Sequence, residues 1–237
     1  MNTEIISTVN LGDVCIVRNK RAKRFIFRVK ESVLYATVPF SCSVKDITKV
    51  LEDNSNRLKT LLQKSNRKVA KMLDFGFRID APNFKFEIVK GSTQKFIINH
   101  SEESIQLIAP PDTNFSNSEI QQWLIKAVEQ LLLKNAKRIL PRLVMQLSKL
   151  HNLKVSQVKL NLSKGRWGSC SSRGNINLSA FLLLLPNHLI NAVILHELTH
   201  LTEMNHSDKF WSLLDSYSHG NALAWNKELK SYKTSIF

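Results

Sequence analysis

Two histidines and a glutamate stand close together in the stretch 192–201, as His196-Glu197-Leu-Thr-His200. On a helix, residues four apart lie above one another on the same face, so His196 and His200 can direct two imidazoles at one metal ion. Glu197, one position along, can reach a water molecule held by that ion. The other residues of the stretch are mostly apolar, which predicts a buried helix. Buried polar groups need partners, and one zinc ion would satisfy all three, although a short pattern can also arise by chance.

A catalytic zinc ion usually takes three protein ligands and leaves its fourth position to water. His206 is the favoured third ligand, because it follows His200 by six residues, the offset that metzincins use. Metzincins have a glycine where this chain has Glu203, so the turn must be made differently here. Glu203 itself, Glu228 and Cys170 are alternative ligands, and His206 could instead be an ordinary exposed loop histidine.

These residue types predict a hydrolase. Three neutral imidazoles would leave one zinc ion its full charge, which lowers the pKa of a bound water molecule to roughly 7. Glu197 would take the proton of that water as general base and pass it to the leaving group as general acid. The metal would polarise the carbonyl or phosphoryl oxygen of the substrate. Glu197 is therefore the expected catalytic residue.

A second stretch, residues 164–179, is rich in glycine and serine. Its glycines allow the backbone to approach another group closely. Arg166 offers a planar fork of donors for a carboxylate, a phosphate or a developing oxyanion of the substrate. In the alternative interpretation the stretch is a structural hairpin, with Trp167 in the core and Arg166 paired with a carboxylate. The candidate substrate-binding residues here are Arg166, Trp167, Ser169, Cys170 and Asn177.

The first part of the chain reads as β-rich with an inserted helix. Apolar residues at helical spacing predict that helix over residues 43–64, with a break at 54–56. Pro110-Pro111 should end this part, and no internal repeat is evident. Short β-branched or aromatic runs predict strands, with a turn at Glu31-Ser32; the strands span residues 14–18, 25–30, 33–39, 84–89, 96–99 and 105–108.

The rest of the chain reads as mostly helical. A long helix should begin at Ser116 or Ser118, and Pro141 should kink or divide it. Residues 154–162 alternate as a strand, residues 163–174 form a loop, residues 175–179 are extended, and helices follow over 187–202, over 207–217 and from 221. We therefore expect an α+β fold in two domains, a β-rich N-terminal region (1–112) and a metal-dependent hydrolase domain (113–237).

Composition bounds the partners and the compartment. The 237 residues include 34 Lys and Arg against 19 Asp and Glu, a net charge of +15, which is compatible with weak binding of polyanions and equally with a solubility role. The densest basic cluster is 20–24, which we interpret as a solvated turn rather than a phosphate grip. Cys15, Cys42 and Cys170 are odd in number and widely spaced, as is typical of a reducing cytosol. Without a signal peptide or a run long enough to cross a membrane, a cytoplasmic protein is expected.

Several motifs spread over the chain point to one protein family. They are Arg166-Trp-Gly-Ser-Cys-Ser, Gly174-Asn-Ile-Asn-Leu, a turn at Pro186, His196-Glu-Leu-Thr-His, Asn205-His-Ser, Phe210-Trp211 and, upstream, the basic run 18–24 and Val38-Pro39. In combination they resemble the YgjP-like metallopeptidase family over nearly the whole chain. The resemblance implies a C-terminal zincin-like domain, related to the SprT-like and WLM-like metalloproteases. It assigns zinc to His196, His200 and His206 and catalysis to Glu197. Family members usually carry Trp-Arg where this chain has Ala180-Phe181, a departure that bears on substrate contacts.

Three functions are compatible with these features. The favoured one is a cytoplasmic zinc-dependent peptidase, whose peptide or protein substrate adds as a strand beside residues 175–179. The second is a metal-dependent hydrolase of nucleotide phosphoanhydrides, with residues 20–24, Arg166 and Arg173 holding the phosphates. The third is a non-catalytic binder of nucleic acid or protein with a structural zinc ion. Such a site would normally close its fourth position with another ligand.

Overall fold

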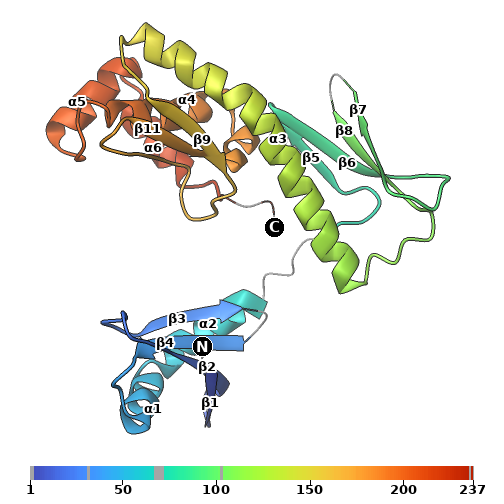
Figure 1. Ribbon diagram of the computed structural model, residues 1–237, viewed down its shortest axis with the longest axis vertical. Helices are drawn as coiled ribbons and strands as arrows, with labels where there is room; N and C mark the ends of the chain where they lie inside the picture. The colour runs from blue at the N-terminus through green and yellow to red at the C-terminus, as the bar shows by residue number, and fades with distance from the viewer. Residues whose placement is uncertain (1–2, 31–32, 67–71, 102–103, 235, 237) are drawn as a thin grey trace. The chain divides into compact units, whose positions relative to one another are not determined.

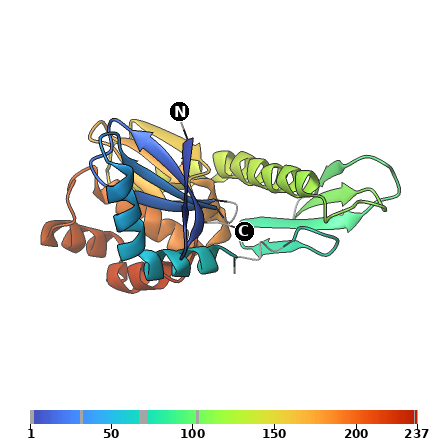
Figure 2. The ribbon, with the colours of Figure 1, turned by 90° about the horizontal axis from the view of Figure 1, so that it is seen from below.

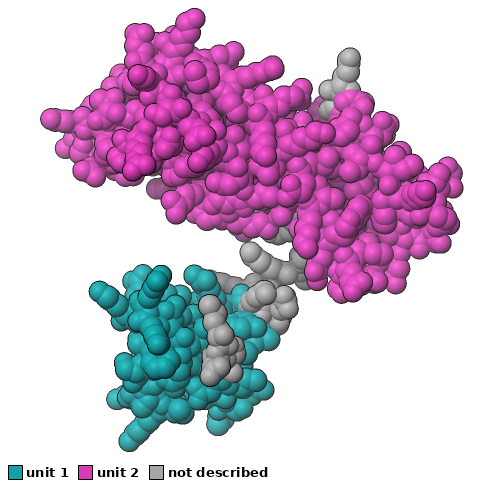
Figure 3. Space-filling model, viewed as in Figure 1, with its two compact units in different colours: residues 1–70 teal, residues 71–237 magenta. Residues whose placement is uncertain are grey.

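The computed structural model describes residues 3–30, 33–66, 72–101, 104–234 and 236. The chain forms two compact units, residues 1–70 and residues 71–237 (Figure 3). Both units combine helices with small mixed sheets, so the fold is α+β, as predicted. The expected turn at Glu31-Ser32 lies outside the described residues. None of the described helices is both long and apolar enough to span a membrane.

The first unit is built on a four-stranded sheet with the order β1-β2-β4-β3. Its strands are β1 (Thr3–Thr8), β2 (Gly12–Asn19), β3 (Ile26–Lys30) and β4 (Val33–Pro39). The central pair, β2 and β4, is parallel, and the outer strands pair antiparallel to it. Every second residue of the central pair is buried, in the two strands that the β-branched and aromatic runs predicted, although β1 was not predicted.

Two short helices, α1 (Val44–Asp53) and α2 (Ser55–Asn66), complete the core of this unit. The N-terminus of α1 is a capping box, in which the Asp46 N–H donates to Ser43 Oγ and the Ser43 N–H donates to the Asp46 carboxylate. The Ser43 hydroxyl also donates to the Asp46 carboxylate at 2.6 Å, and this bond, together with the one from the Ser43 N–H, lowers the pKa of Asp46. The two helices separate at Asn54, where the sequence predicted a break.

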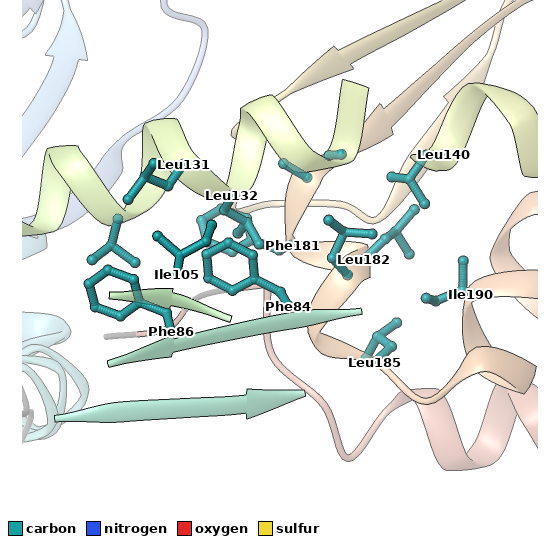
Figure 4. Close-up of a cluster of buried hydrophobic side chains, with 14 of the residues drawn as sticks. Phe84, Phe86, Ile105, Leu131, Leu132, Leu140, Phe181, Leu182, Leu185 and Ile190 are labelled. Carbon is teal, nitrogen blue, oxygen red and sulfur yellow. The ribbon is translucent and has the colours of Figure 1, made fainter. Parts of the chain in front are cut away.

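A second four-stranded sheet opens the second unit, with the order β5-β6-β8-β7. Its strands are β5 (Arg78–Ala81), β6 (Phe84–Lys90), β7 (Ile97–His100) and β8 (Ile105–Ala109). Side chains of this sheet, such as Phe86 and Ile105, share one apolar core with Leu131 and Leu132 of the following helix (Figure 4). Residues 71–112, which we expected in the N-terminal domain, therefore belong to the second unit, and the division falls at residue 70.

The following helix, α3 (Ser118–Leu150), joins the two halves of the second unit. It begins after Asn117, whose Oδ1 accepts the Glu119 N–H at 2.8 Å. The helix continues through Pro141 and is not divided there. In Figures 1 and 2 it runs from the β5–β8 sheet to the sheet that contains β9. Its buried residues pack on both, so one core extends along the whole unit.

The far half of this unit contains a three-stranded sheet and four short helices. The strands are β9 (Gln157–Asn161), β10 (Gly168–Cys170) and β11 (Asn175–Ser179), and the helices are η1 (Ala180–Leu184), α4 (Asn187–Thr199), α5 (Asp208–Tyr217) and α6 (Ala222–Leu229). The sheet order is β10-β11-β9, so both edges of β11 are already paired and β10 is an edge strand. A peptide cannot add beside residues 175–179, contrary to our expectation. Ala180 and Phe181 are fully buried, so the departure from the family's Trp-Arg lies in the core.

Candidate metal and catalytic site

Helix α4 carries the histidine and glutamate motif. It ends at Thr199 with His200 as its C-cap, three residues earlier than the sequence predicted. Apolar residues on its other faces, including Ile194 and Leu198, are buried in the core of the unit. This packing fixes the rotation of the helix, and with it the direction in which His196 and His200 point.

Three imidazoles gather at the end of this helix. One ligand nitrogen each of His196, His200 and His206 lies within 4.8 Å of the others. The Nε2 atoms of His196 and His206 are 3.0 Å apart. Two nitrogens bound to a tetrahedral zinc ion at 2.0–2.1 Å would be roughly 3.3 Å apart, so the spacing of His196 and His206 is close to that of two ligands of one zinc ion.

Phe210 of α5 supports all three rings. Its ring centroid lies 4.9 Å from that of His196 and 4.7 Å from those of His200 and His206, and its side chain is fully buried. Phe210 belongs to one of the family motifs, but the sequence predicted no role for it. The available signal was its position four residues after His206, at the start of an amphipathic helix.

A backbone carbonyl orients His200. Its Nδ1 lies 3.0 Å from the carbonyl oxygen of Glu203, and a neutral ring that donates this hydrogen bond keeps its lone pair on Nε2. Glu203 therefore contributes its backbone to the site. Glu228 instead contacts His188, with 2.9 Å between Oε2 and Nε2. Among the described residues, the three-histidine group contains neither of these glutamates nor Cys170.

Two of the histidines are held in the neutral form that binds metal. Burial, together with the neighbouring His200 and His206, lowers the pKa of His196 to about 4. Burial also lowers the pKa of His200, with a smaller contribution from His206, although the hydrogen bond to Glu203 opposes this. Three imidazole nitrogens at this spacing fit zinc.

Glu197 lies beside these rings and against the backbone of β10. Its side chain is 6 % exposed, and burial raises its pKa to about 7, although the positive charge of Arg166 opposes the shift. A Cβ atom on Gly168 would lie 2.7 Å from the Oε1 atom of Glu197, so any larger residue at this position would displace the carboxylate. A carboxylate with a pKa near neutrality suits a general base.

Two cavities flank the backbone of β10. One, of about 270 Å³, is bordered by His196 and Glu197, and the other, of about 210 Å³, by Ser169 and Asn177. Both are also lined by Arg166, Trp167 and Gly168.

The candidate substrate-binding residues therefore separate into groups. Arg166 and Trp167 border both cavities, and Trp167 also packs against the core, so both interpretations of that residue apply. Ser169 and Asn177 border the smaller cavity and are 3.5 Å apart. Cys170 lines neither; its thiol is half-buried, and burial together with Glu197 raises its pKa.

The basic cluster belongs to the first unit. Lys20, Arg21, Lys23 and Arg24 are all exposed between β2 and β3, as expected for a solvated turn, and Lys20 lies 5.5 Å from the ring centroid of Phe40. Arg173, the other residue considered for holding phosphates, borders neither of the two cavities.

Comparison with known proteins identifies a family. The family described as "YgjP-like, metallopeptidase domain" matches residues 23–232. No curated protein matches the chain. Among solved structures, the crystal structure of the metallopeptidase zymogen of Pyrococcus abyssi abylysin is similar, with 20% identity and a TM-score of 0.35 over 39% of this chain and 94% of that one.

Proposed function

We propose that this chain, which belongs to the YgjP-like metallopeptidase family, is a zinc-dependent peptidase with Glu197 as its catalytic base. His196, His200 and His206 would hold the single zinc ion. The observation that carries the proposal is the gathering of three imidazole nitrogens within 4.8 Å of one another beside a buried glutamate. Three imidazole ligands beside a cavity that His196 and Glu197 border are typical of a catalytic zinc site.

In this proposal Glu197 moves the proton. The zinc ion, when bound, supplies the Lewis acid that polarises the scissile carbonyl and acidifies a water molecule. With a pKa of about 7, the Glu197 carboxylate accepts a proton from the attacking water and gives it to the departing amine. Arg166, whose charge already acts on Glu197, is placed to donate hydrogen bonds to an oxyanion or a carboxylate of the substrate.

Strand β10 is the element that suits a peptide backbone. Among the residues that the structure describes it pairs with β11 alone, and Gly168 at its start lies against Glu197. A substrate strand added at this free edge would make main-chain hydrogen bonds and pass beside the catalytic carboxylate. The expected strand addition thus moves from β11 to β10.

The cavity beside Glu197 favours peptides over nucleotides. Its walls include Val193, Leu214 and Trp225, which offer an apolar side chain a good environment and a phosphate a poor one. We place the peptidase in the cytosol, because its three cysteines are all free thiols.

Replacement of the base tests the proposal. Zinc-loaded wild type and Glu197→Gln are compared on casein and on a panel of nucleoside triphosphates, with the zinc content of both measured. We expect the wild type to cleave casein and release no phosphate, and Glu197→Gln to keep its zinc and lose activity by about 10²–10⁴-fold. A chelator should abolish cleavage, and added zinc should restore it.

Other outcomes would select other functions. Phosphate release without casein cleavage would indicate a nucleotide hydrolase. Zinc binding without either activity would indicate a structural metal in a binding protein. Undiminished cleavage by Glu197→Gln would remove Glu197 from the mechanism.

A further inference from the structure

The cavity beside Glu197 has a size and a lining that select a ligand. Its volume of about 270 Å³ lies just below the roughly 300–1,000 Å³ of pockets that hold small-molecule ligands, so it suits a single large side chain. Helices α4, α5 and α6 all contribute to its apolar wall, which consists of Ala192, Val193, Leu214, Ala222, Trp225 and Leu229, with Trp167 from the loop before β10.

The polar groups of the cavity are few and are mostly accounted for. His196 and Glu197 belong to the candidate catalytic site, and Arg166 lies beside them. Ser218 is 1 % exposed, and its hydroxyl donates to the carbonyl oxygen of Asp215 at 3.3 Å. Asn226 is the remaining polar residue of the lining. A ligand inside the cavity therefore meets mostly apolar surface.

We propose that this cavity is the specificity pocket of the peptidase and accepts a large apolar side chain, such as Leu, Met or Phe, from the substrate residue beside the scissile bond. The inference rests on the proposed function, since it is the peptidase site that gives the cavity a substrate. His196 and Glu197 line the cavity and also carry the chemistry, so a side chain bound here belongs to a residue next to the bond that is cut.

Ala222 is the position at which the cavity can be filled by substitution. It is 4 % exposed, begins α6 and contributes to the cavity wall, so a larger side chain at this position would occupy the cavity. Ala224 lies two residues along the same helix and is exposed, and it does not line the cavity. Ala222→Phe and Ala224→Phe therefore make a matched pair that adds the same bulk inside and outside the cavity.

The test begins with cleavage-site profiling. Wild type loaded with zinc is incubated with a peptide library, and the cleaved bonds are identified by mass spectrometry. We expect one position beside the scissile bond to be enriched in Leu, Met and Phe. Replacing that residue with Ala in a good substrate should lower kcat/KM by about 10- to 100-fold, the range of discrimination that an apolar pocket gives.

The variants then assign the preference to the cavity. Ala222→Phe should lower kcat/KM for the large-residue peptide by at least 10-fold more than for a peptide with Ala at that position, whereas Ala224→Phe should behave as wild type. Leu229→Ala enlarges the cavity and should shift the preference toward Phe and Trp. It provides an independent test if Ala222→Phe does not fold, which its melting temperature and zinc content will show.

A binding measurement separates this inference from the proposed function. Trp167 and Trp225 line the cavity, so a bound side chain should change their fluorescence. Glu197→Gln should bind the large-residue peptide at least 10-fold more tightly than its Ala counterpart, even if the wild type cleaves neither.

The failures of the two proposals are distinct. Cleavage without a preference for large apolar residues, or a preference unchanged in a folded Ala222→Phe and in Leu229→Ala, would overturn the pocket and leave the peptidase intact. Without cleavage, equal binding of the two peptides would overturn the pocket as well.

Discussion

The two four-stranded sheets of the molecule follow one plan. Their orders, β1-β2-β4-β3 and β5-β6-β8-β7, correspond strand by strand, with a central parallel pair and antiparallel outer strands in each. The register of the pair β3–β4 also corresponds to that of β7–β8. In the first sheet Ile26 pairs with Thr37, and in the second Ile97 pairs with Ile108, both members being 71 residues further on.

The buried positions correspond as well. Ile16 and Ile88 are at most 1 % exposed in their respective sheets, and Leu34 and Ile105 hold equivalent places on β4 and β8. What differs is the helical part that follows. Two short helices, of 10 and 12 residues, pack on the first sheet. The second sheet is instead covered by the 33-residue α3, which continues to the half that holds the three histidines. The first sheet therefore forms a core of its own, whereas the second sheet, with the same strand order, shares its core with the half of the unit that carries the candidate site.

The largest difference between the two sheets should appear when an equivalent core residue is truncated in each. Ile16→Ala and Ile88→Ala each remove a fully buried side chain, at an expected cost of about 2–5 kcal/mol in the free energy of unfolding of the unit concerned. Because only the second sheet shares a core with the candidate site, Ile88→Ala should also weaken zinc retention on heating, and Ile16→Ala should not. Calorimetry with parallel zinc analysis measures both; equal loss of zinc in the two variants would show that the units are not independent.

The sequence predicted what depends on local periodicity. The break at Asn54, the strands of alternating residues and the helix of His196 all follow from patterns within a few neighbouring residues. The correspondence of the two sheets was not visible in the sequence, because what they share is the pattern of buried positions and not the residue types. Val14 and Phe86, for example, occupy equivalent buried positions with different side chains.

The rest depended on distant contacts. Strand β10 has only three residues, Gly168 to Cys170, and takes its extended form from pairing with β11. The division at residue 70 arises because α3 buries the second sheet, and no residue pattern within that sheet predicts this packing. The role of Phe210 beneath the imidazoles likewise requires α5 to fold back against α4. His206 as a zinc ligand and Glu197 as the base stay predictions.

Gly165 and Gly168, which lie before and at the start of β10, test how strictly the position of the Glu197 carboxylate depends on this backbone. Gly168→Ala would place a Cβ atom 2.7 Å from the Glu197 carboxylate, whereas a Cβ on Gly165 meets nothing within 4 Å. The flexible Glu197 side chain can move away, so Gly168→Ala should fold and bind zinc but lose about 10²-fold in kcat, as expected for a displaced catalytic group. Gly165→Ala should match the wild type in a casein assay. Full activity of Gly168→Ala would show that the carboxylate need not touch β10.

The smallest expected difference concerns one ion pair in each unit. In the second unit Lys164 Nζ lies 2.7 Å from Oε1 of Glu129, which is on α3 and only 14% exposed, so the pair ties the loop before Arg166 to the long helix. Lys164→Met would leave that carboxylate without its partner, and we expect the second unit to lose about 1–3 kcal/mol.

The matching pair in the first unit joins Arg18 and Glu4, with 3.2 Å between Nε and Oε2. Arg18 also donates to the carbonyl oxygens of Phe40 and Cys42, so Glu4→Gln leaves the guanidinium satisfied and should cost about 0.2–1 kcal/mol. Urea unfolding of each variant measures both losses. Because Lys164 lies two residues before Arg166, Lys164→Met should also lower kcat/KM on casein by a few-fold, and Glu4→Gln should leave it unchanged. Equal losses of stability and activity in the two variants would mean that the Lys164–Glu129 pair contributes no more than an ordinary surface ion pair.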